Sequence, residues 1–524
     1  MGDSLNWTAK DKLESEVLPL LSERALTGDA HQKDGRVRLR DQRLFRQLAY
    51  VNGKWCASDQ GRDHAVTDPA TDVVLGSVPA LSKTQIQQAI DHAHSAFPAW
   101  KALMADERAA ILMRWHDLIL DNKEDLALLI VLEQGKPLIE ARGEIDYGAS
   151  FVRWFAQEAG RAYGETIPSH IPNAQLATMR EPIGVAALIT PWNFPNAMIT
   201  RKAAAALAIG CTVIVKPAGE TPFSALALAE LAERAGFPSG VFNMVTGEPE
   251  MVSEIICKSD KVKALSFTGS TRVGRLLLQQ SAATVKKCSM ELGGNAPFIV
   301  LPDMGVDEAA KAAIDAKFQT SGQDCLAANR IFVPREKYEA FLASFQLKME
   351  QLKVGNGLDE GVALGPLIFE RAVKKTQDLV DDAVAKGARL LAGDQSKAPA
   401  RNFFMPTLLA DVTPEMKVYR EENFGPVAGV LAYDDLDDVI PMANDTEYGL
   451  AAYVFGNNLN QIWKLIPALE FGMVSVNSVK MTGQPIPFGG MKQSGLGREG
   501  SLHGFDEYSE IKYYCMGALP SSKG

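Results

Sequence analysis

The sequence predicts an α/β protein with two domains, each built on a parallel sheet. From residue 178 onward, short apolar runs alternate with helical patterns of about 10 to 15 residues, which is typical of βαβ units. A second series of the same kind begins near Ala296, and a Gly-rich stretch around residues 292–294 separates the two. At 524 residues the chain is too long for one hydrophobic core. Both domains are therefore expected to be Rossmann-like.

The elements before residue 178 are expected in the following order. The first 40 residues are polar apart from one loose helical stripe, and we interpret them as an N-terminal extension. Alternating residues around Asn52 and Gly53 predict a β-hairpin over residues 48–55. Helical periodicity over residues 83–121 and again over 123–157 carries no motif, so we interpret these helices as scaffold.

The two α/β series then supply the strands and helices of the domains. The first reads VAALIT, RKAAAALAIG, TVIVKP, ALALAELAERAG, VFNMVTG and KALSFTGS. The second contains PFIV, a helix over residues 307–318, a turn at Cys325, RIFVP, a helix over residues 335–353, and the later strands PTLLADV, AGVLAYD and GMVSVN. Ligands are expected at the carboxyl ends of the parallel strands.

Composition and charge exclude several classes of protein. Lysines and arginines number 54 against 64 acidic residues, a net charge of −10 that argues against a nucleic-acid partner. The six cysteines are dispersed without CxxC pairs, so neither a disulfide framework nor a metal site is expected. The first twenty residues are acidic, unlike a signal peptide, and the longest apolar run, residues 203–215, is shorter than the roughly 18 residues that span a bilayer. We expect a cytoplasmic protein without a membrane partner.

A G-x-G-x-x-G pattern at residues 495–500 lacks the context of a dinucleotide fingerprint. No apolar strand leads into it and no clear helix follows. We interpret it as a turn.

Four polar positions follow strands of the predicted sheets. Asn193 lies in a turn between two prolines, Lys216 ends a strand, Gly269 and Ser270 precede a helix, and Glu291 precedes two glycines. The free N–H groups at such a helix start suit a phosphate. Each residue also has a plain structural interpretation, as a turn former or a solvated side chain.

Cys325 is the candidate nucleophile. It lies in QTSGQDCLAANR, among small and turn-forming residues that let a backbone approach a substrate. A lone cysteine is more often a small buried hydrophobic residue. The stretch alone leaves both interpretations open.

Together these motifs resemble the aldehyde dehydrogenase superfamily. ITPWNFP, KPA, FTGSTRVG, MELGGNAP, GQDC, EENFGPV and PFGGMKQSGLGRE occur in its order and spacing over about residues 45–517. LEQGKPLIEARGEI, AMITRKAAAALA, TPFSALALAELAERAG and GREGSLHG are similar to the succinate-semialdehyde dehydrogenase branch.

The resemblance implies a mechanism for three residues. Cys325 attacks the aldehyde, the Asn193 amide and the Cys325 N–H bind the oxyanion, and hydride passes to NAD or NADP. Glu291 then activates the water that hydrolyses the thioester, which favours a carboxylic acid product over transfer to coenzyme A.

The resemblance also implies a cofactor site and its selectivity. The implied cofactor-binding residues are Trp192, Lys216, Gly219, Gly269, Ser270, Glu422 and Phe424. NAD-selective relatives often carry a glutamate where this chain has Gly219, so we expect NADP to be accepted as well as NAD.

Substrate recognition follows the family pattern only in part. The implied substrate-binding residues are Arg201, Phe194, Met198, Gln319, Asp324 and Lys480. Arg201 matches an arginine that binds the substrate carboxylate, but Gln319 stands where the branch has a second arginine. Asp324 is similar to an acidic residue of aminoaldehyde dehydrogenases. We therefore expect a carboxylated semialdehyde such as succinate semialdehyde, with an aminoaldehyde, a bulkier aromatic or branched semialdehyde, and a non-enzymatic binding or structural role as alternatives.

The resemblance also implies how the chain is divided into domains. It implies an NAD(P)-binding domain from residues 41–161 and 183–292, and a catalytic domain from residues 293–499. Residues 162–182 and 500–524 resemble a small β oligomerisation element, so a homodimer or homotetramer is expected by analogy.

Overall fold

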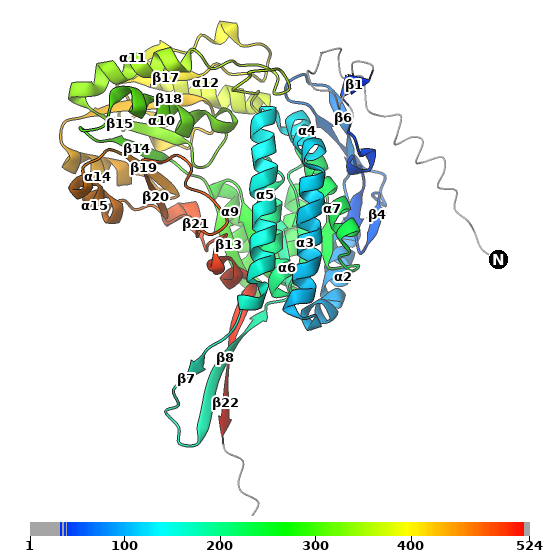
Figure 1. Cartoon of the computed structure of the whole chain (residues 1–524). Coiled ribbons are helices and arrows are strands. Elements are labelled where there is room, and N and C mark those ends of the chain that lie inside the picture. Colours follow the sequence, from blue (N-terminus) through cyan, green and yellow to red (C-terminus); the bar gives the residue numbers. More distant parts are fainter. Residues whose placement is uncertain (1–31, 34–35, 38, 518–524) are drawn as a thin grey trace, which may run out of the picture.

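The chain folds into two α/β lobes with a narrow arm, as the computed structural model shows (Figure 1). The structure describes residues 32–33, 36–37 and 39–517. The helical stripe expected within the first 40 residues lies outside this part. The α/β class predicted from the sequence is confirmed, although both sheets are mixed and not purely parallel.

The first lobe is built on an eight-stranded sheet with the order β21-β13-β12-β9-β10-β11-β3-β4. Its central strands are mutually parallel and almost wholly buried. They are β9 (Val185–Ile189), β10 (Thr212–Lys216), β11 (Phe242–Met244), β12 (Val262–Thr268) and β13 (Lys287–Glu291). Strands that are buried on both faces consist of consecutive apolar residues, and for this reason they could be predicted from the sequence.

Antiparallel strands close both edges of this sheet. The hairpin of β3 (Ala49–Val51) and β4 (Lys54–Cys56) forms as predicted. Asn52 and Gly53 connect its strands with φ of 53° and 73°, as a two-residue turn requires. At the other edge β21 (Gly495–Leu496) pairs with the end of β13, so the interpretation of this stretch as a simple turn was wrong.

Helices cover both faces of the first sheet. Alternate residues of β9 divide between the two hydrophobic clusters, because successive side chains of a strand point to opposite faces. One face packs against α3 (Ala105–Asp121), α4 (Lys123–Gln134), α5 (Leu138–Glu158), α6 (Ala197–Ile209) and α7 (Pro222–Ala235). The other packs against α2 (Lys83–Ala102), α8 (Pro249–Lys258) and α9 (Thr271–Ser281).

Each long helical stretch before residue 178 is broken once. Residues 83–121 divide into α2 and α3, and residues 123–157 into α4 and α5. Gly135 ends α4 in the left-handed region with φ of 93°. Pro137 then precedes the first residue of α5.

The second lobe is a seven-stranded sheet with the order β16-β17-β18-β15-β14-β19-β20. Only β16 runs antiparallel to its neighbour. The strands are β14 (Ala296–Val300), β15 (Ala328–Pro334), β16 (Arg389–Ala392), β17 (Thr407–Ala410), β18 (Val427–Tyr433), β19 (Ala451–Phe455) and β20 (Met473–Val476). One face packs against α10 (Val306–Phe318) and α11 (Tyr338–Met349), and the other against α12 (Glu370–Ala385), α14 (Leu436–Asn444) and α15 (Leu459–Ala468).

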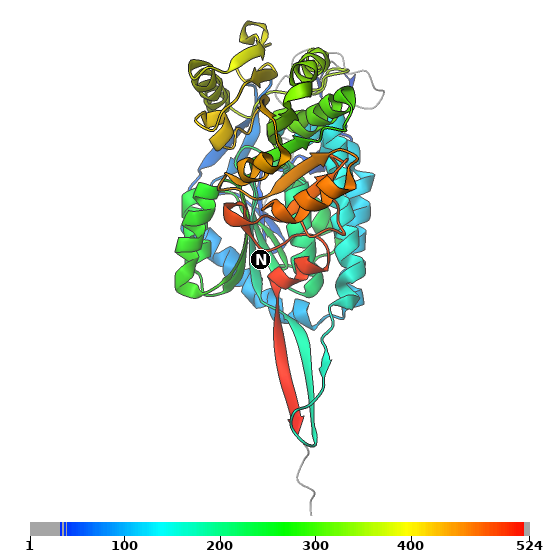
Figure 2. The same cartoon turned by 90° about the vertical axis from the view of Figure 1, so that its left-hand side faces the viewer.

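A three-stranded arm projects from the first lobe, as both views show (Figures 1 and 2). It consists of β7 (Thr166–Ile167), β8 (Ala174–Pro182) and β22 (Ser509–Gly517). Apolar side chains of β22, among them Ile511, Tyr513 and Met516, are more than half exposed. Oligomerisation through this arm stays a prediction.

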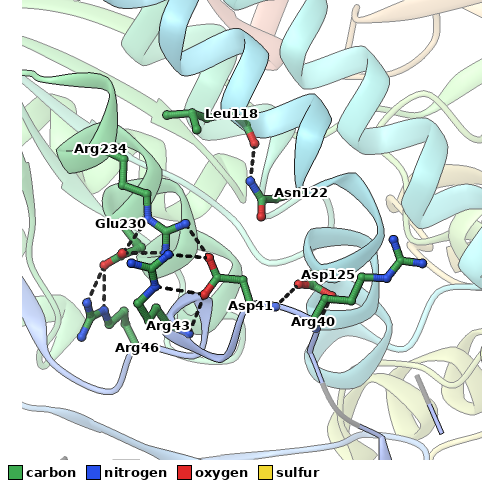
Figure 3. Close-up of polar contacts among 9 residues, drawn as sticks. All are labelled: Arg40, Asp41, Arg43, Arg46, Leu118, Asn122, Asp125, Glu230 and Arg234. Carbon is green, nitrogen blue, oxygen red and sulfur yellow. Dashed lines mark hydrogen bonds and ion pairs between the residues drawn. The ribbon is translucent and has the colours of Figure 1, made fainter. Parts of the chain in front are cut away.

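The beginning of the continuously described chain is fixed to the first lobe (Figure 3). Asp125 of α4 accepts hydrogen bonds from the N–H groups of Arg40 and Asp41, at 2.9 and 2.8 Å. Burial opposes ionisation of Asp41, but hydrogen bonds from Arg43 and Arg234 hold the pKa of its carboxyl down at about 2. Residues 40 and 41 are therefore anchored beside α4 and α7.

Within the described ranges, no helix combines the length and apolar character needed to cross a bilayer.

Candidate active site

A cavity of about 690 Å³ brings the predicted substrate residues together with the predicted nucleophile. Its lining includes Cys325 and all of the residues proposed to contact substrate: Phe194, Met198, Arg201, Gln319, Asp324 and Lys480. Their segments are far apart in the sequence and meet where the two lobes face each other.

The loop that carries Cys325 has an unusual backbone. It begins with the 3-10 turn Gln319–Gly322 directly after α10 and leads into β15. Thr320 and Ser321 have φ of 51° and 57°, a conformation that costs energy for residues other than glycine. At Gly322 a Cβ atom would lie 2.3 Å from the Gly425 carbonyl oxygen, so only glycine fits there. Contacts around the loop therefore fix the position of Cys325.

The Cys325 thiol is half-buried, and its surroundings disfavour the thiolate. Burial raises its pKa well above the ordinary value, and the carboxylates of Asp324 and Glu422 raise it further. Asp324 lines the same cavity, its Oδ1 accepts a hydrogen bond from the Leu326 N–H at 2.9 Å, and burial raises the pKa of its carboxyl. Arg201 acts in the opposite direction on the thiol.

Asn193 lies in the turn after β9, and its side chain points towards the Cys325 loop. Its Nδ2 donates to the Gln323 carbonyl oxygen at 3.0 Å. One amide hydrogen of Asn193 and the Cys325 N–H have no acceptor within the described chain. Two neighbouring free donors can bind an oxyanion.

Glu291 ends β13 in a buried position. Neither of its carboxylate oxygens has a hydrogen-bond partner among the described residues. Burial raises its pKa well above the ordinary carboxyl value, and the neighbouring Glu499 adds to the effect. Glu291 is not part of the cavity lining, but it is close enough to raise the pKa of the Cys325 thiol.

A buried charge cluster lies beside Glu291, and the sequence did not indicate it. Glu499 forms ion pairs with both Arg201 and Lys202. Lys202 Nζ also donates to Ser266 Oγ at 2.9 Å. The two cations share the Glu499 carboxylate, and the buried Glu291 carboxyl lies beside them. On the cavity side, the Arg201 guanidinium lies 4.2 Å from the centre of the Phe488 ring.

The first sheet provides a crevice of the kind that binds dinucleotides. The chain runs from β9 through β10 to β11 on one side of β9 and then crosses to β12 and β13 on the other. Ligands bind at such a switch of direction, beyond the carboxyl ends of the strands. Trp192 follows β9 here, and Gly269 and Ser270 follow β12.

The side chains at this crevice fit a cofactor with phosphates. Ser270 caps the amino end of α9, where free N–H groups and the helix dipole favour an anion. Burial lowers the pKa of Lys216 to about 8, and among the residues that the structure describes its Nζ donates only to the Pro217 carbonyl oxygen, at 3.0 Å. Further donors of Lys216 therefore remain for a ligand.

The second lobe contributes the remaining predicted cofactor residues. Glu422 Oε1 accepts a hydrogen bond from the Gly294 N–H at 2.9 Å. The Phe424 ring lies 5.5 Å from that of Trp192 and perpendicular to it. At Gly219 a Cβ atom would lie 3.4 Å from His64 Nε2, so a side chain can be accommodated there.

Helix α5 also belongs to the site, and its interpretation as scaffold was wrong. Glu140, Glu144 and Tyr147 of α5 line the cavity beside Cys325. They are spaced at i, i+4 and i+7, which places them on one face of the helix. The sequence offered two signals for them, this spacing and the segment LEQGKPLIEARGEI, which contains Glu140 and Glu144.

The described residues contain no group of three His, Cys, Asp or Glu side chains arranged to hold a metal ion.

The family match, the relatives and the solved structures that are similar to this chain agree with one another. A model described as the aldehyde dehydrogenase family matches residues 55–514. The chain is 65% identical over 486 residues to the aspartate-semialdehyde dehydrogenase (non-phosphorylating) of Halomonas elongata, covering 93% of this chain and 99% of the relative. It is 51% identical over 481 residues to the succinate-semialdehyde dehydrogenase (NADP(+)) GabD of Escherichia coli, covering 92% and 100%. The crystal structure of an E. coli NADP dependent enzyme superimposes with a TM-score of 0.91 at 51% identity, covering 92% and 100%.

Proposed function

The chain belongs to the aldehyde dehydrogenase family and is an NAD(P)-dependent oxidoreductase acting on aldehydes, and from this premise we propose that its substrate is a carboxylated semialdehyde such as succinate semialdehyde. The observation that carries the proposal is the buried guanidinium of Arg201 in the cavity lining. A buried cation of this kind favours an anionic group on the substrate. The names of the two relatives, which act on aspartate semialdehyde and succinate semialdehyde, support the same class.

In the proposed mechanism the Cys325 sulfur attacks the aldehyde carbon as a thiolate. The carbonyl oxygen becomes an oxyanion that accepts hydrogen bonds from the Asn193 amide and the Cys325 N–H. Loss of one such donor typically costs about 3 kcal/mol of transition-state stabilisation.

The bound cofactor supplies the hydride acceptor, and the carbon attached to Cys325 becomes a thioester. Glu291, once ionised, takes a proton from a water molecule that attacks this thioester. The carboxylic acid leaves and the Cys325 thiolate is released. The buried position of Glu291 keeps its pKa above the ordinary carboxyl value, which makes it a stronger base when it ionises.

A second candidate substrate carries an amino group. Asp324 lines the cavity and could pair with an ammonium group. The relative from H. elongata acts on aspartate semialdehyde, which carries both an amino group and a carboxylate. Arg201 and Asp324 together would then bind the two charges of one substrate. The cavity also has room for a bulkier aldehyde.

Replacing Arg201 with alanine should remove the preference for carboxylated aldehydes. We expect kcat/KM for succinate semialdehyde to fall by about 30-fold or more, because truncating a buried charged partner costs about 2 kcal/mol or more. The measurement is the ratio of kcat/KM for succinate semialdehyde to kcat/KM for butanal. A general loss of active enzyme lowers both values equally and leaves this ratio unchanged. Arg153→Ala, on the exposed side of α5, is the control. An unchanged ratio in Arg201→Ala would refute the substrate proposal.

Asp324→Asn separates the two candidate substrates. If the amino group is recognised by Asp324, this variant should lose the preference for aspartate semialdehyde over succinate semialdehyde. It should leave the preference of both over butanal in place.

We expect the enzyme to use NADP as well as NAD. Gly219 leaves out the carboxylate that would repel a ribose phosphate, so kcat/KM with NADP should lie within about a thousandfold of that with NAD. Gly219→Glu should reduce use of NADP more than use of NAD, and Gly219→Ala, which adds bulk without charge, should change the ratio little. A wild-type preference for NAD beyond this range would show that this interpretation of Gly219 is wrong.

A further inference from the structure

A buried ion pair lies behind the turn that carries Asn193. Lys136 Nζ is 2.7 Å from Glu144 Oε2, and the two side chains are 0% and 1% exposed. Lys136 lies between α4 and α5, and Glu144 lies on α5. Burying two charges is costly unless both are paired and hydrogen-bonded. Both side chains therefore need further hydrogen bonds, and these bonds connect the pair to the turn that contains Asn193.

The remaining contacts of Lys136 fix the beginning of the turn. Its Nζ donates to the Asn193 carbonyl oxygen at 2.7 Å. The same ammonium group lies 3.8 Å from the centre of the Phe194 ring, within reach of a cation–π interaction. Lys136 thus holds the peptide group of Asn193 and the ring that follows it.

The second oxygen of Glu144 fixes the end of the same turn. Glu144 Oε1 accepts hydrogen bonds from the N–H groups of Asn196 and Ala197, at 2.8 and 3.2 Å. Asn196 is the first residue before α6, but its side chain makes no capping hydrogen bond. Glu144 therefore caps α6, the helix that carries Arg201.

Close packing of α5 against α6 leaves little freedom for the turn. At Gly148, one helical turn after Glu144, a Cβ atom would lie 2.7 Å from Asn196 Oδ1 and 2.8 Å from Thr200 Oγ1. A larger residue at Gly148 would push the helices apart.

The same helix also reaches the loop of the nucleophile. Glu140, one turn before Glu144, accepts a hydrogen bond from the Thr320 N–H at 3.0 Å. Thr320 is one of the two residues with a left-handed backbone before Cys325. Both segments that supply oxyanion donors are thus attached to one face of α5.

We propose that Lys136, through its ion pair with Glu144, is a positioning residue that holds the Asn193 amide where the oxyanion forms. Lys136 does not line the substrate cavity, so it acts through Asn193. The inference rests on the proposed role of Asn193 in aldehyde oxidation. It gives a function to Lys136, which the sequence analysis did not single out.

A double-mutant cycle tests this coupling. We expect Lys136→Met to slow formation of reduced cofactor in a single turnover by about 10- to 100-fold, since a displaced donor loses much of its effect. In an Asn193→Ala background, Lys136→Met should slow the same step by less than about threefold, because the donor that it positions is already absent. If the double variant were slowed by the full product of the two single effects, the two residues would act independently and the proposal would be overturned.

Two further measurements separate positioning from general damage. Alkylation of Cys325 by iodoacetamide forms no oxyanion, so its rate should change little in Lys136→Met. An equal loss in alkylation and in aldehyde oxidation would also overturn the proposal.

Lys136→Arg should recover a large part of the rate of single-turnover oxidation, because it keeps the positive charge. The matched control is Lys286→Met, which removes another buried lysine that donates to backbone oxygens, those of Ile256 and Ser259 at 3.2 and 2.8 Å, and should leave single-turnover oxidation unchanged.

A combined variant controls for poor folding of Lys136→Met. Lys136→Met leaves Glu144 with an unpaired buried charge, whereas Lys136→Met combined with Glu144→Gln leaves none. The combined variant should fold and should show the same dependence on Asn193. All rates are measured with succinate semialdehyde and with butanal. A wrong substrate assignment would then alter the wild-type preference but not the coupling between Lys136 and Asn193.

Discussion

Replacing Cys325 with alanine is expected to lower aldehyde oxidation by at least about a thousandfold, since loss of a nucleophile removes the covalent route altogether. The sulfur lines the cavity together with Arg201 and Asp324, and neither neighbour can form a thioester. The measurement is the absorbance of reduced cofactor formed from NADP and succinate semialdehyde, in a single turnover and in the steady state. Cofactor binding should persist in the variant, because Cys325 is not among the groups that fit the cofactor's phosphates.

The control is Cys56→Ala, because Cys56 is also half-buried and free but lies on an edge strand of the first sheet. It should retain full activity. Retained oxidation in Cys325→Ala would mean that another group attacks the aldehyde. Loss of activity in both variants would point to general damage, which a comparison of thermal unfolding would reveal.

The strands of both sheets were predictable because burial on both faces requires consecutive apolar residues. β9 and β10 are buried at every position and read as unbroken apolar runs. The hairpin at Asn52 and Gly53 was equally clear, because few residues adopt that turn. Breaks within helical stretches were harder to predict. Gly135 and Pro137 divide α4 from α5, although the helical periodicity continues on either side.

The residues of the candidate site were predictable where a motif marks them, and not where only the packing of the fold brings them together. Cys325, Asn193 and Glu291 lie in short motifs whose order resembles the family. Glu499 lies 297 residues from Lys202, and no local pattern predicts that they form an ion pair.

The orientation of side chains was also beyond the sequence. Asp324 could have faced solvent, where it would have affected Cys325 little. The structure places it in the cavity, where it raises the pKa of the thiol. A sequence records which residues are neighbours along the chain, whereas the pKa of a buried group depends on neighbours in space.

Replacing Glu291 with glutamine is expected to leave a burst of about one equivalent of reduced cofactor and to lower steady-state turnover by roughly 100- to 10,000-fold. The burst persists because attack by Cys325 and hydride transfer precede the step that needs Glu291. Turnover then stops at the thioester, because glutamine cannot accept a proton from water. Rapid mixing followed by mass measurement of the acylated protein checks both parts.

Ser289→Ala, on the same strand as Glu291 and also buried, is the control and should show normal turnover after the burst. Loss of the burst itself in Glu291→Gln would assign Glu291 to the first step. Full steady-state turnover would require a different base.

The dependence on pH separates the two groups, because each acts only after losing a proton. Burial raises the pKa of both Glu291 and Cys325, so wild-type rates should increase with pH above the ordinary carboxyl range. The burst depends on the Cys325 thiolate, whereas steady-state turnover also depends on ionised Glu291. In Glu291→Gln the burst should therefore still increase with pH, while the residual turnover should lose the part of its pH dependence that Glu291 contributes. If the steady-state profile kept its wild-type form in this variant, Glu291 would not be the titrating base.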